Sequence, residues 1–313
     1  MKLRTPRLVI AVLVATAAAY AQQPKPWPPG VQKVASESPV LSPEAEMQTF
    51  YMPPGYHVEL VASEPLIQDP IVIDLDSDGR LWAIEMPTFM EEINPSNEFE
   101  RQPRNRVVVL EDTNNDGKMD KRTVFMDGLV LPHALKVLEH GVLVAEPPNL
   151  WMVHDKDGDL HADSKDLVTN TYGRLDSALE HNANSLFWAL DNWIYTSEID
   201  TFLRLKNGQF DVRKTIARGQ WGATQDDAGR IYRNTNESVL HVDLVPTQYY
   251  ARNPNLLRTR GSYERLADDA NVANIVWPVR KNPGTNRAYQ LGIDREDGTL
   301  AHFTSVCAPM REK

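Results

Sequence analysis

The residues best suited to chemistry are gathered in one polar segment, where His181, Asn182 and Asn184 stand shortly before Asp200. A carboxylate beside an imidazole orients the ring and raises its basicity, which suits a general base. His181 precedes one expected strand and Asp200 ends the antiparallel strand after it, so both should lie at the same end of a sheet. We predict His181 as a catalytic base with Asp200 as its partner. The alternative is a buried histidine that hydrogen-bonds a loop carbonyl.

Two Asp-rich loops form a second group of candidate ligands. Each places side-chain oxygens at positions 1, 3, 5 and 9 of a calcium-type loop, a spacing that surrounds a hard cation with oxygen ligands. Neither loop has the Glu of position 12, so we expect modest affinity and a structural role. The alternative is a solvated turn that only reverses the chain. The predicted ligands are Asp112, Asn114, Asp116 and Asp120 in the first loop, and Asp155, Asp157, Asp159 and Asp163 in the second.

Short apolar runs that alternate with turn clusters indicate the framework that must position these residues. Four such runs in each repeat of roughly 40 residues predict an all-β fold, a β-propeller of four-stranded antiparallel blades. The alternative is a β-sandwich with a chance repeat. The expected strands span residues 70–75, 80–85, 106–111 and 122–126; 134–138, 142–145, 150–154 and 166–169; 185–190, 193–197, 202–205 and 210–216; and 223–225, 230–233 and 240–244.

The clearest internal echo lies at hairpin turns. Asp78–Trp82 has the sequence Asp-Gly-Arg-Leu-Trp, Ala228–Tyr232 has Ala-Gly-Arg-Ile-Tyr, and Leu190–Tyr195 is a looser copy. A small or polar residue permits the sharp turn, and the aromatic residue packs between blades. This echo favours repeated blades.

The N-terminal segment has the pattern of a secretory signal peptide. Basic residues at positions 2, 4 and 7 precede an apolar run over 8–19, and small residues at 19 and 21 offer a cleavage site. The alternative is a membrane anchor, for which the run is short. We expect a periplasmic or extracellular protein with signal peptide 1–21, a linker or N-terminal arm 22–45, a propeller domain 46–313, and no membrane span after cleavage.

The propeller is expected to be of the six-bladed type and incomplete at its C-terminal end. Residues 252–274 are irregular, as in an insertion, and residues 302–306 have a strand-like composition. Residues 56–61 are expected to supply an outer strand to a closing blade.

Charge and cysteine content exclude several functional classes. Lys and Arg number 33 against 43 Asp and Glu, a net charge of −10, and no basic cluster stands out, so nucleic acid is not an expected partner. Cys307 is the single cysteine, which excludes an internal disulfide, a CxxCH haem site and multi-cysteine metal sites in this chain. The sequence also lacks dinucleotide, P-loop and serine-hydrolase motifs.

The segment from His181 to Asp200 resembles the soluble quinoprotein glucose and aldose-sugar dehydrogenases, through the pattern His-x-x-x-x-Leu-x-x-x-x-Asp-x-x-Ile/Leu-Tyr followed by Asp. Proteins of that family are six-bladed propellers that bind pyrroloquinoline quinone (PQQ) with calcium. The resemblance implies His181 as the base, Asp200 as its partner, and cofactor contacts from Arg218, Asn182 and Asn184.

The chain departs from that family where the family is rich in glycine. Asn182, Ala183 and Asn184 follow the histidine, and Ile199 stands where the family has Gly before the aspartate.

Over residues 46–310 the chain resembles the PVC-type membrane-bound dehydrogenase domains. This resemblance is specific for a family and implies a dehydrogenase only weakly. Its motifs are Pro53-Pro54-Gly55-Tyr56, Glu64-Pro65, Asp69-Pro70, Gly79-Arg80-Leu81-Trp82 and the Leu-Glu-Asp-Thr-x-x-Asp-Gly run over 110–117.

Two functions stay open at this point. The first is an oxidoreductase that transfers hydride from a sugar or alcohol hydroxyl to a quinone, with an unspecified electron acceptor. The second is a non-catalytic propeller that binds a glycan or another protein. Trp188, Trp193 and Trp221 either stack on sugar rings or pack between blades.

Overall fold

The computed structural model describes residues 40–89, 98–176, 181–266, 292–293, 295–296, 300–303 and 306–310. The predicted signal peptide and most of the predicted arm lie outside these residues. The chain divides into two compact units, and the first is described over residues 40–59. Its helix α1 (Pro43–Met47) begins after Ser42, whose hydroxyl accepts a hydrogen bond from the Ala45 amide. The arm predicted to run to residue 45 therefore already contains the start of a helix.

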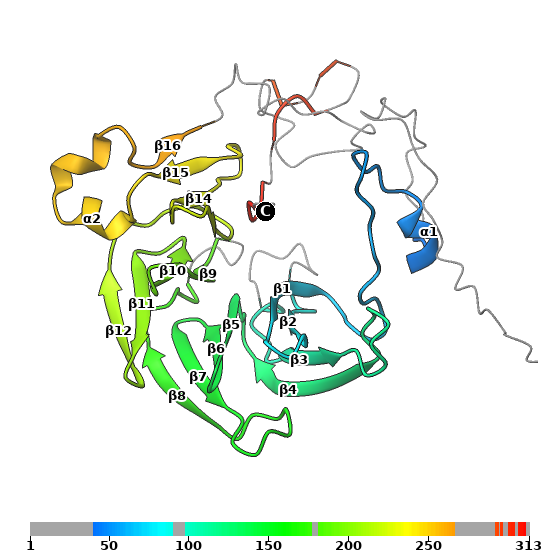
Figure 1. The fold of residues 1–313 in the computed structure, drawn as a ribbon. Helices are drawn as coiled ribbons and strands as arrows, with labels where there is room; N and C mark the ends of the chain where they lie inside the picture. Colours follow the sequence, from blue (N-terminus) through cyan, green and yellow to red (C-terminus); the bar gives the residue numbers. More distant parts are fainter. Residues whose placement is uncertain are drawn as a thin grey trace, which may run out of the picture. The chain divides into compact units, whose positions relative to one another are not determined.

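The described residues of the second unit form four sheets, each of four antiparallel strands (Figure 1). This confirms the predicted all-β fold with four-stranded antiparallel blades. The first sheet comprises β1 (Pro70–Leu75), β2 (Leu81–Glu85), β3 (Asn105–Glu111) and β4 (Lys121–Leu129). The second comprises β5 (Ala134–Leu138), β6 (Gly141–Glu146), β7 (Asn149–His154) and β8 (Ser164–Thr169).

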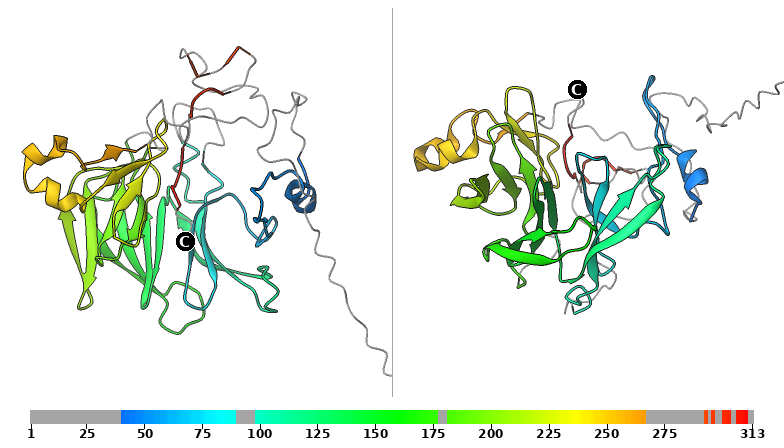
Figure 2. Two further views of the ribbon diagram at one scale, coloured as in Figure 1. Left: turned by 45° about the horizontal axis from the view of Figure 1, so that its top comes forward. Right: turned by 60° about the horizontal axis from the view of Figure 1, so that its bottom comes forward.

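The third sheet comprises β9 (Asn184–Trp188), β10 (Ile194–Ser197), β11 (Thr201–Lys206) and β12 (Gln209–Lys214). The fourth comprises β13 (Thr224–Gln225), β14 (Ile231–Arg233), β15 (His241–Asp243) and β16 (Glu264–Arg265). In every sheet the strands follow one another in chain order, as in a propeller blade (Figure 1 and Figure 2).

Apolar side chains pack between consecutive sheets and fix the order of the blades. Burial of such surface is the main favourable term in folding, and each sheet here covers a face of the next. As a result, the inner strand β5 contacts both β1 and β9. Between the first and second sheets lie Trp82, Ile84, Val107, Leu135, Val142 and Val144; between the second and third lie Leu143, Leu150, Leu186, Ile194 and Leu203; and Tyr195, Phe202 and Ile231 join the third to the fourth.

Two of the repeated hairpin turns each begin with an aspartate whose carboxylate hydrogen-bonds to residues of the same turn. Asp76 accepts hydrogen bonds from the Arg80 amide at 2.9 Å and from the Trp82 indole N–H at 2.9 Å. Asp226 accepts from the Arg230 amide at 3.0 Å and from the Tyr232 hydroxyl at 2.9 Å. The echo in the sequence therefore reflects one hydrogen-bonded turn in which the carboxylate also fixes the aromatic ring.

The fourth sheet differs from the prediction. Residues 252–274 were expected to be an irregular insertion, but this segment contains a 3-10 helix (Pro254–Arg258) and β16, the fourth strand of the last sheet. A helix, α2 (Thr247–Ala251), precedes them, and residues 267–274 lie outside the described residues. β16 was not predicted because a strand of two residues is too short to show an alternation of apolar and polar side chains.

Two further strand predictions fail in the described residues. Residues 56–61 form no strand, and residues 302, 303 and 306 belong to no strand, while 304–305 lie outside the described part. The six-blade count stays a prediction. No helix within the described ranges is long and apolar enough to cross a bilayer.

We expect Asp76→Ala to lower the free energy of unfolding by about 1–3 kcal/mol, because buried donors lose a charged acceptor. The matched control is Asp78→Ala, in the same turn, where an exposed ion pair with Arg80 is lost. Urea unfolding measures both variants. Equal stability of the two variants would show that the turn does not depend on the Asp76 carboxylate.

Candidate functional site

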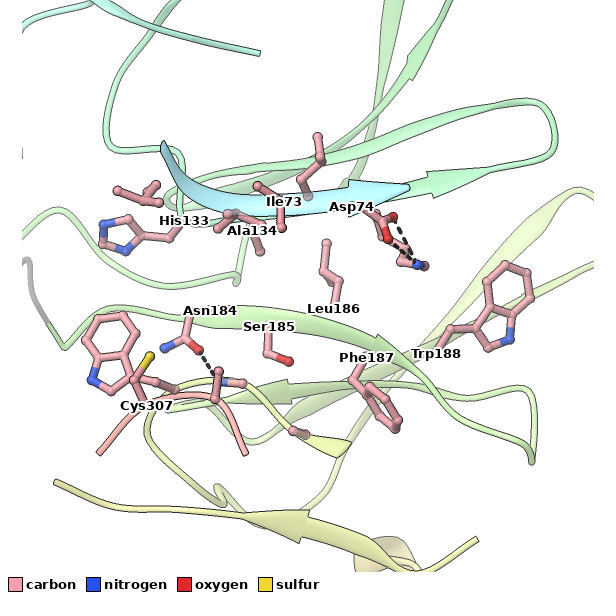
Figure 3. A pocket seen from close by; sticks show the side chains of 18 of the residues that line it. Ile73, Asp74, His133, Ala134, Asn184, Ser185, Leu186, Phe187, Trp188 and Cys307 are labelled. Atoms are coloured by element: carbon pink, nitrogen blue, oxygen red, sulfur yellow. Dashed lines mark hydrogen bonds and ion pairs between the residues drawn. The ribbon is translucent and has the colours of Figure 1, made fainter. Parts of the chain in front are cut away.

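A cavity of about 700 Å³ lies where the inner strands of the sheets meet (Figure 3). Strands β1, β5 and β9 line it, together with the segment leading into β13 and residues 306–308. Its lining is mostly apolar, and its size falls in the range of small-molecule sites. The apolar and aromatic lining residues are Ile71, Val72, Ile73, Phe89, Ala134, Leu135, Leu186, Phe187, Trp188, Trp221, Ala223 and Val306.

The charged side chains in the described lining neutralise each other. Lys136 Nζ lies 2.8 and 2.9 Å from the two carboxylate oxygens of Asp74, and the Val137 amide donates to the same carboxylate at 2.8 Å. The cavity therefore offers no unpaired charge from these residues to an ionic ligand.

His133 lines the cavity immediately before β5 and was missed by the sequence analysis. Its side chain is buried, at 4% exposure, and neither ring nitrogen has a hydrogen-bond partner. Burial lowers its pKa to about 4, so the ring is neutral at pH 7. The third repeat has polar residues directly before its predicted inner strand, namely His181, Asn182 and Asn184. The same position in the second repeat could have identified His133.

Residues 306–308 form part of the cavity wall. The Val306 amide donates to the Asn236 carbonyl at 3.3 Å, and the Ala308 amide donates to the Trp221 carbonyl at 2.9 Å. Cys307 lies between them and borders the cavity, near Asn184 and on the same side as His133 (Figure 3). The wall is thus held by backbone hydrogen bonds.

His181 lies next to this cavity and is not among the described residues that line it. The Asn236 amide donates to Gln220 Oε1 at 2.7 Å, which fixes the orientation of the Gln220 side chain. Gln220 Nε2 must then donate to His181 Nδ1, 2.7 Å away. In the neutral ring the proton therefore sits on Nε2, and the basic lone pair is occupied by Gln220.

Glu198, and not Asp200, is the carboxylate beside His181. Glu198 Oε1 lies 3.6 Å from His181 Nδ1, and burial raises the pKa of this carboxyl even though His181 opposes the shift. Asp200 Oδ1 instead binds Lys214 Nζ at 2.6 Å. The physical reason is its place in the sheet: the Thr215 amide donates to the Asp200 carbonyl beside the outer strand β12, away from β9. The structure therefore gives His181 a different carboxylate neighbour, Glu198, from the predicted Asp200.

The predicted cofactor contacts serve internal structure. The Arg218 side chain is only 12% exposed and lies between Asp243, at 3.5 Å, and the ring of Tyr263, whose centroid lies 4.7 Å from the guanidinium carbon. Asn182 accepts from the Arg174 amide at 3.0 Å and donates to the Arg174 carbonyl at 2.6 Å. The polar atoms of Arg218 and Asn182 therefore bind other residues of the protein and do not converge on a common ligand.

Asn184 lines the cavity, but its amide is also used by the fold. Its Nδ2 donates to the carbonyls of Asn182 and Gln220, and its Oδ1 accepts from the Gly222 amide at 3.4 Å. PQQ bears carboxylates that need unpaired cations, and Arg218 is bound to Asp243. The described residues therefore do not fit this cofactor.

The first acidic loop, between β3 and β4, is closed by its own backbone. Asp112 accepts from the amides of Asp116 and Gly117, and Asp120 accepts from Thr113. Loss of solvation raises the pKa of Asp112, but these amides outweigh it and leave the pKa below its usual value. Asn114 also accepts from the Asp116 amide, so the predicted ligands largely satisfy a turn.

The second acidic loop, between β7 and β8, gathers its carboxylates more closely. One oxygen from each of Asp155, Asp157 and Asp159 lies within 4.8 Å of the others. The Asp159 amide lowers the pKa of Asp157, but the charges of Asp159, Asp163 and Asp155 with loss of solvation raise it above its usual value. Asp163 accepts from the Lys156 amide at 2.7 Å. Calcium at both loops stays a prediction, and the geometry favours the second.

The three tryptophans that were expected to stack on sugars or pack between blades divide into two kinds. Trp188 and Trp221 line the cavity. Trp193 packs against Phe202, with ring centroids 4.3 Å apart, and lies beneath the Arg204 guanidinium. Trp193 is therefore a packing residue, while the other two are available to a ligand.

Comparison with known families assigns the chain to a protein family. Residues 42–311 match the family described as a domain of unknown function, DUF7133. The chain belongs to the DUF7133 family. No curated protein matches this DUF7133 chain. Its fold is distantly similar to a solved luciferin-regenerating enzyme, with a TM-score of 0.32, 11% identity, and coverage of 78% of this chain and 96% of the other. The resemblances to PVC-type and quinoprotein dehydrogenases stay predictions.

Acid should destabilise the fold through His133. The unfolded chain protonates this histidine near 6.5, whereas the folded chain does so only near 4, so the unfolded state binds the proton first. The neutral His133 ring therefore makes its full contribution to the free energy of unfolding above pH 6.5. Roughly 3 kcal/mol of that free energy is lost as the pH falls to 4. In His133→Phe we expect the unfolding free energy to decline less over this range. Parallel pH profiles for variant and wild type would contradict this assignment.

Calcium should raise the melting temperature if the second loop binds it. At about 5 mM calcium and millimolar affinity, the expected rise is roughly 2–4 °C. Asp157→Asn should abolish the rise without lowering the calcium-free melting temperature, because it relieves repulsion among carboxylates. Asp127→Asn, at an exposed position of β4 outside both loops, is the control. An unchanged melting curve for wild type would exclude a calcium site at either loop.

Proposed function

We propose that this DUF7133 chain binds a small, uncharged and largely apolar molecule in the cavity between its inner strands. The observation that supports this most directly is the lining itself. It combines apolar and aromatic side chains with a single charged pair, Asp74 and Lys136, that is already neutralised. Ligand sites of this kind bury most of a small molecule against apolar walls and orient it with few polar groups.

The position of the cavity in the fold supports a binding role. Strands β1, β5 and β9 all contribute residues to the cavity wall, and β1 leaves Ile71 and Ile73 exposed there, Ile73 at 62%. Exposed apolar side chains that converge from several strands gain free energy when a ligand removes them from water. A glycan suits this lining less well, because a sugar needs many more polar partners than the cavity provides.

The dehydrogenase hypothesis with His181 as base has less support. The basic nitrogen of His181 accepts from Gln220, its predicted partner Asp200 binds Lys214, and Arg218 binds Asp243. PQQ added to the protein provides the direct comparison. Quenching of tryptophan fluorescence by PQQ that is lost in His181→Ala would favour the dehydrogenase hypothesis over the binding proposal.

The binding proposal is tested with N-phenyl-1-naphthylamine, an uncharged dye that fluoresces in apolar surroundings. We expect saturable fluorescence with wild type. Ile73→Trp should place a larger side chain in the cavity, block part of the dye's site and weaken dye binding about tenfold. The matched control is Leu75→Trp, on the same strand and equally exposed, outside the described lining of this cavity. Absence of saturable binding, or equal loss in both variants, would overturn the proposal.

A further inference from the structure

We propose that His133 is the polar anchor of this cavity and that its ligand is an uncharged ring compound carrying one hydroxyl group. This inference rests on the proposed binding function and adds the chemical class of the ligand. It is drawn from the unpaired imidazole, the aromatic lining and the absence of a free charge among the described lining residues.

The imidazole of His133 is the unsatisfied polar group of the cavity wall. Both its nitrogens are buried without a hydrogen-bond partner, and the ring lies edge-on to the Phe89 ring, with 6.2 Å between centroids. Leaving a buried polar group unpaired costs about 1–3 kcal/mol, and native proteins rarely do so without a reason. A ligand that pairs with the ring removes this cost.

The backbone holds His133 at the start of the inner strand. Its amide donates to the Ala145 carbonyl at 3.1 Å, and Ala134, the next residue, pairs with Ala145 in the β5–β6 ladder. Both nitrogens are covered by neighbouring atoms, so the ring must rotate about its side-chain bonds to meet a ligand. Such a rotation involves the side chain alone and needs no change of the backbone.

The chemistry of a neutral imidazole selects the ligand class. It offers one N–H donor and one acceptor nitrogen, which a hydroxyl group can match because it both donates and accepts. Burial holds the ring in this neutral form at pH 7. Asp74, whose carboxylate is paired with Lys136, lies away from His133 in the cavity (Figure 3). Phe89, Trp188 and Trp221 supply flat apolar surfaces for a ring.

The test compares 2-naphthol with naphthalene, which differ only in the hydroxyl group. Displacement of N-phenyl-1-naphthylamine gives both dissociation constants. Wild type should prefer 2-naphthol about tenfold, the effect of one added hydrogen bond to an otherwise unpaired group. His133→Phe should bind both compounds equally, with the affinity for naphthalene retained. His181→Phe, which changes the histidine beside the cavity, is the matched control and should keep the preference.

His133→Gln protects the test against a folding defect, because its amide supplies a donor and an acceptor. We expect this variant to retain part of the preference for 2-naphthol. Equal binding of the two compounds by wild type, or an unchanged preference in His133→Phe, would overturn the role of His133. In both cases the dye still binds, so the proposed function stands. Failure of the dye to bind wild type would instead remove the proposed function itself.

Discussion

Burial of apolar surface between consecutive sheets is the interaction on which the rest of this structure depends. Each sheet is small, and neither of its faces could stay exposed, so the chain stacks one sheet against the next. Stacking in chain order brings the first strand of each sheet inward. The cavity is the consequence, because the inner strands β1, β5 and β9 that line it are held in place by the packing of their sheets.

The turns between the first and second strands keep those inner strands in register. Asp191 repeats the arrangement seen at Asp76 and Asp226, since it accepts from the Trp193 amide at 3.1 Å and from the Tyr195 hydroxyl at 2.7 Å. One carboxylate therefore closes the turn and orients an aromatic ring that packs between sheets. Burial and the hydrogen bond to Asp191 raise the pKa of Tyr195 far above its usual value, so this hydroxyl remains a donor. Local turn chemistry and blade packing thus support the same fold.

The strands could be predicted from the sequence because their pattern is local. Alternation and turn residues located Pro70–Leu75 and Ala134–Leu138 without error, and the repeat length indicated the blades. The candidate site could not be predicted in the same way. Whether Glu198 or Asp200 meets His181 depends on the turn between two strands, and Arg218 meets Asp243 across a sheet. The burial of His133 depends on packing between blades, which spacing along the chain does not encode.

The central claim is that the inner strands enclose a site for an uncharged ring compound anchored at His133. A crystal structure of the chain soaked with 2-naphthol tests this most directly. We predict electron density for the ring among β1, β5 and β9, with the hydroxyl oxygen within hydrogen-bond distance of a His133 nitrogen. Density elsewhere on the protein, or a cavity filled by the chain's own side chains, would contradict it.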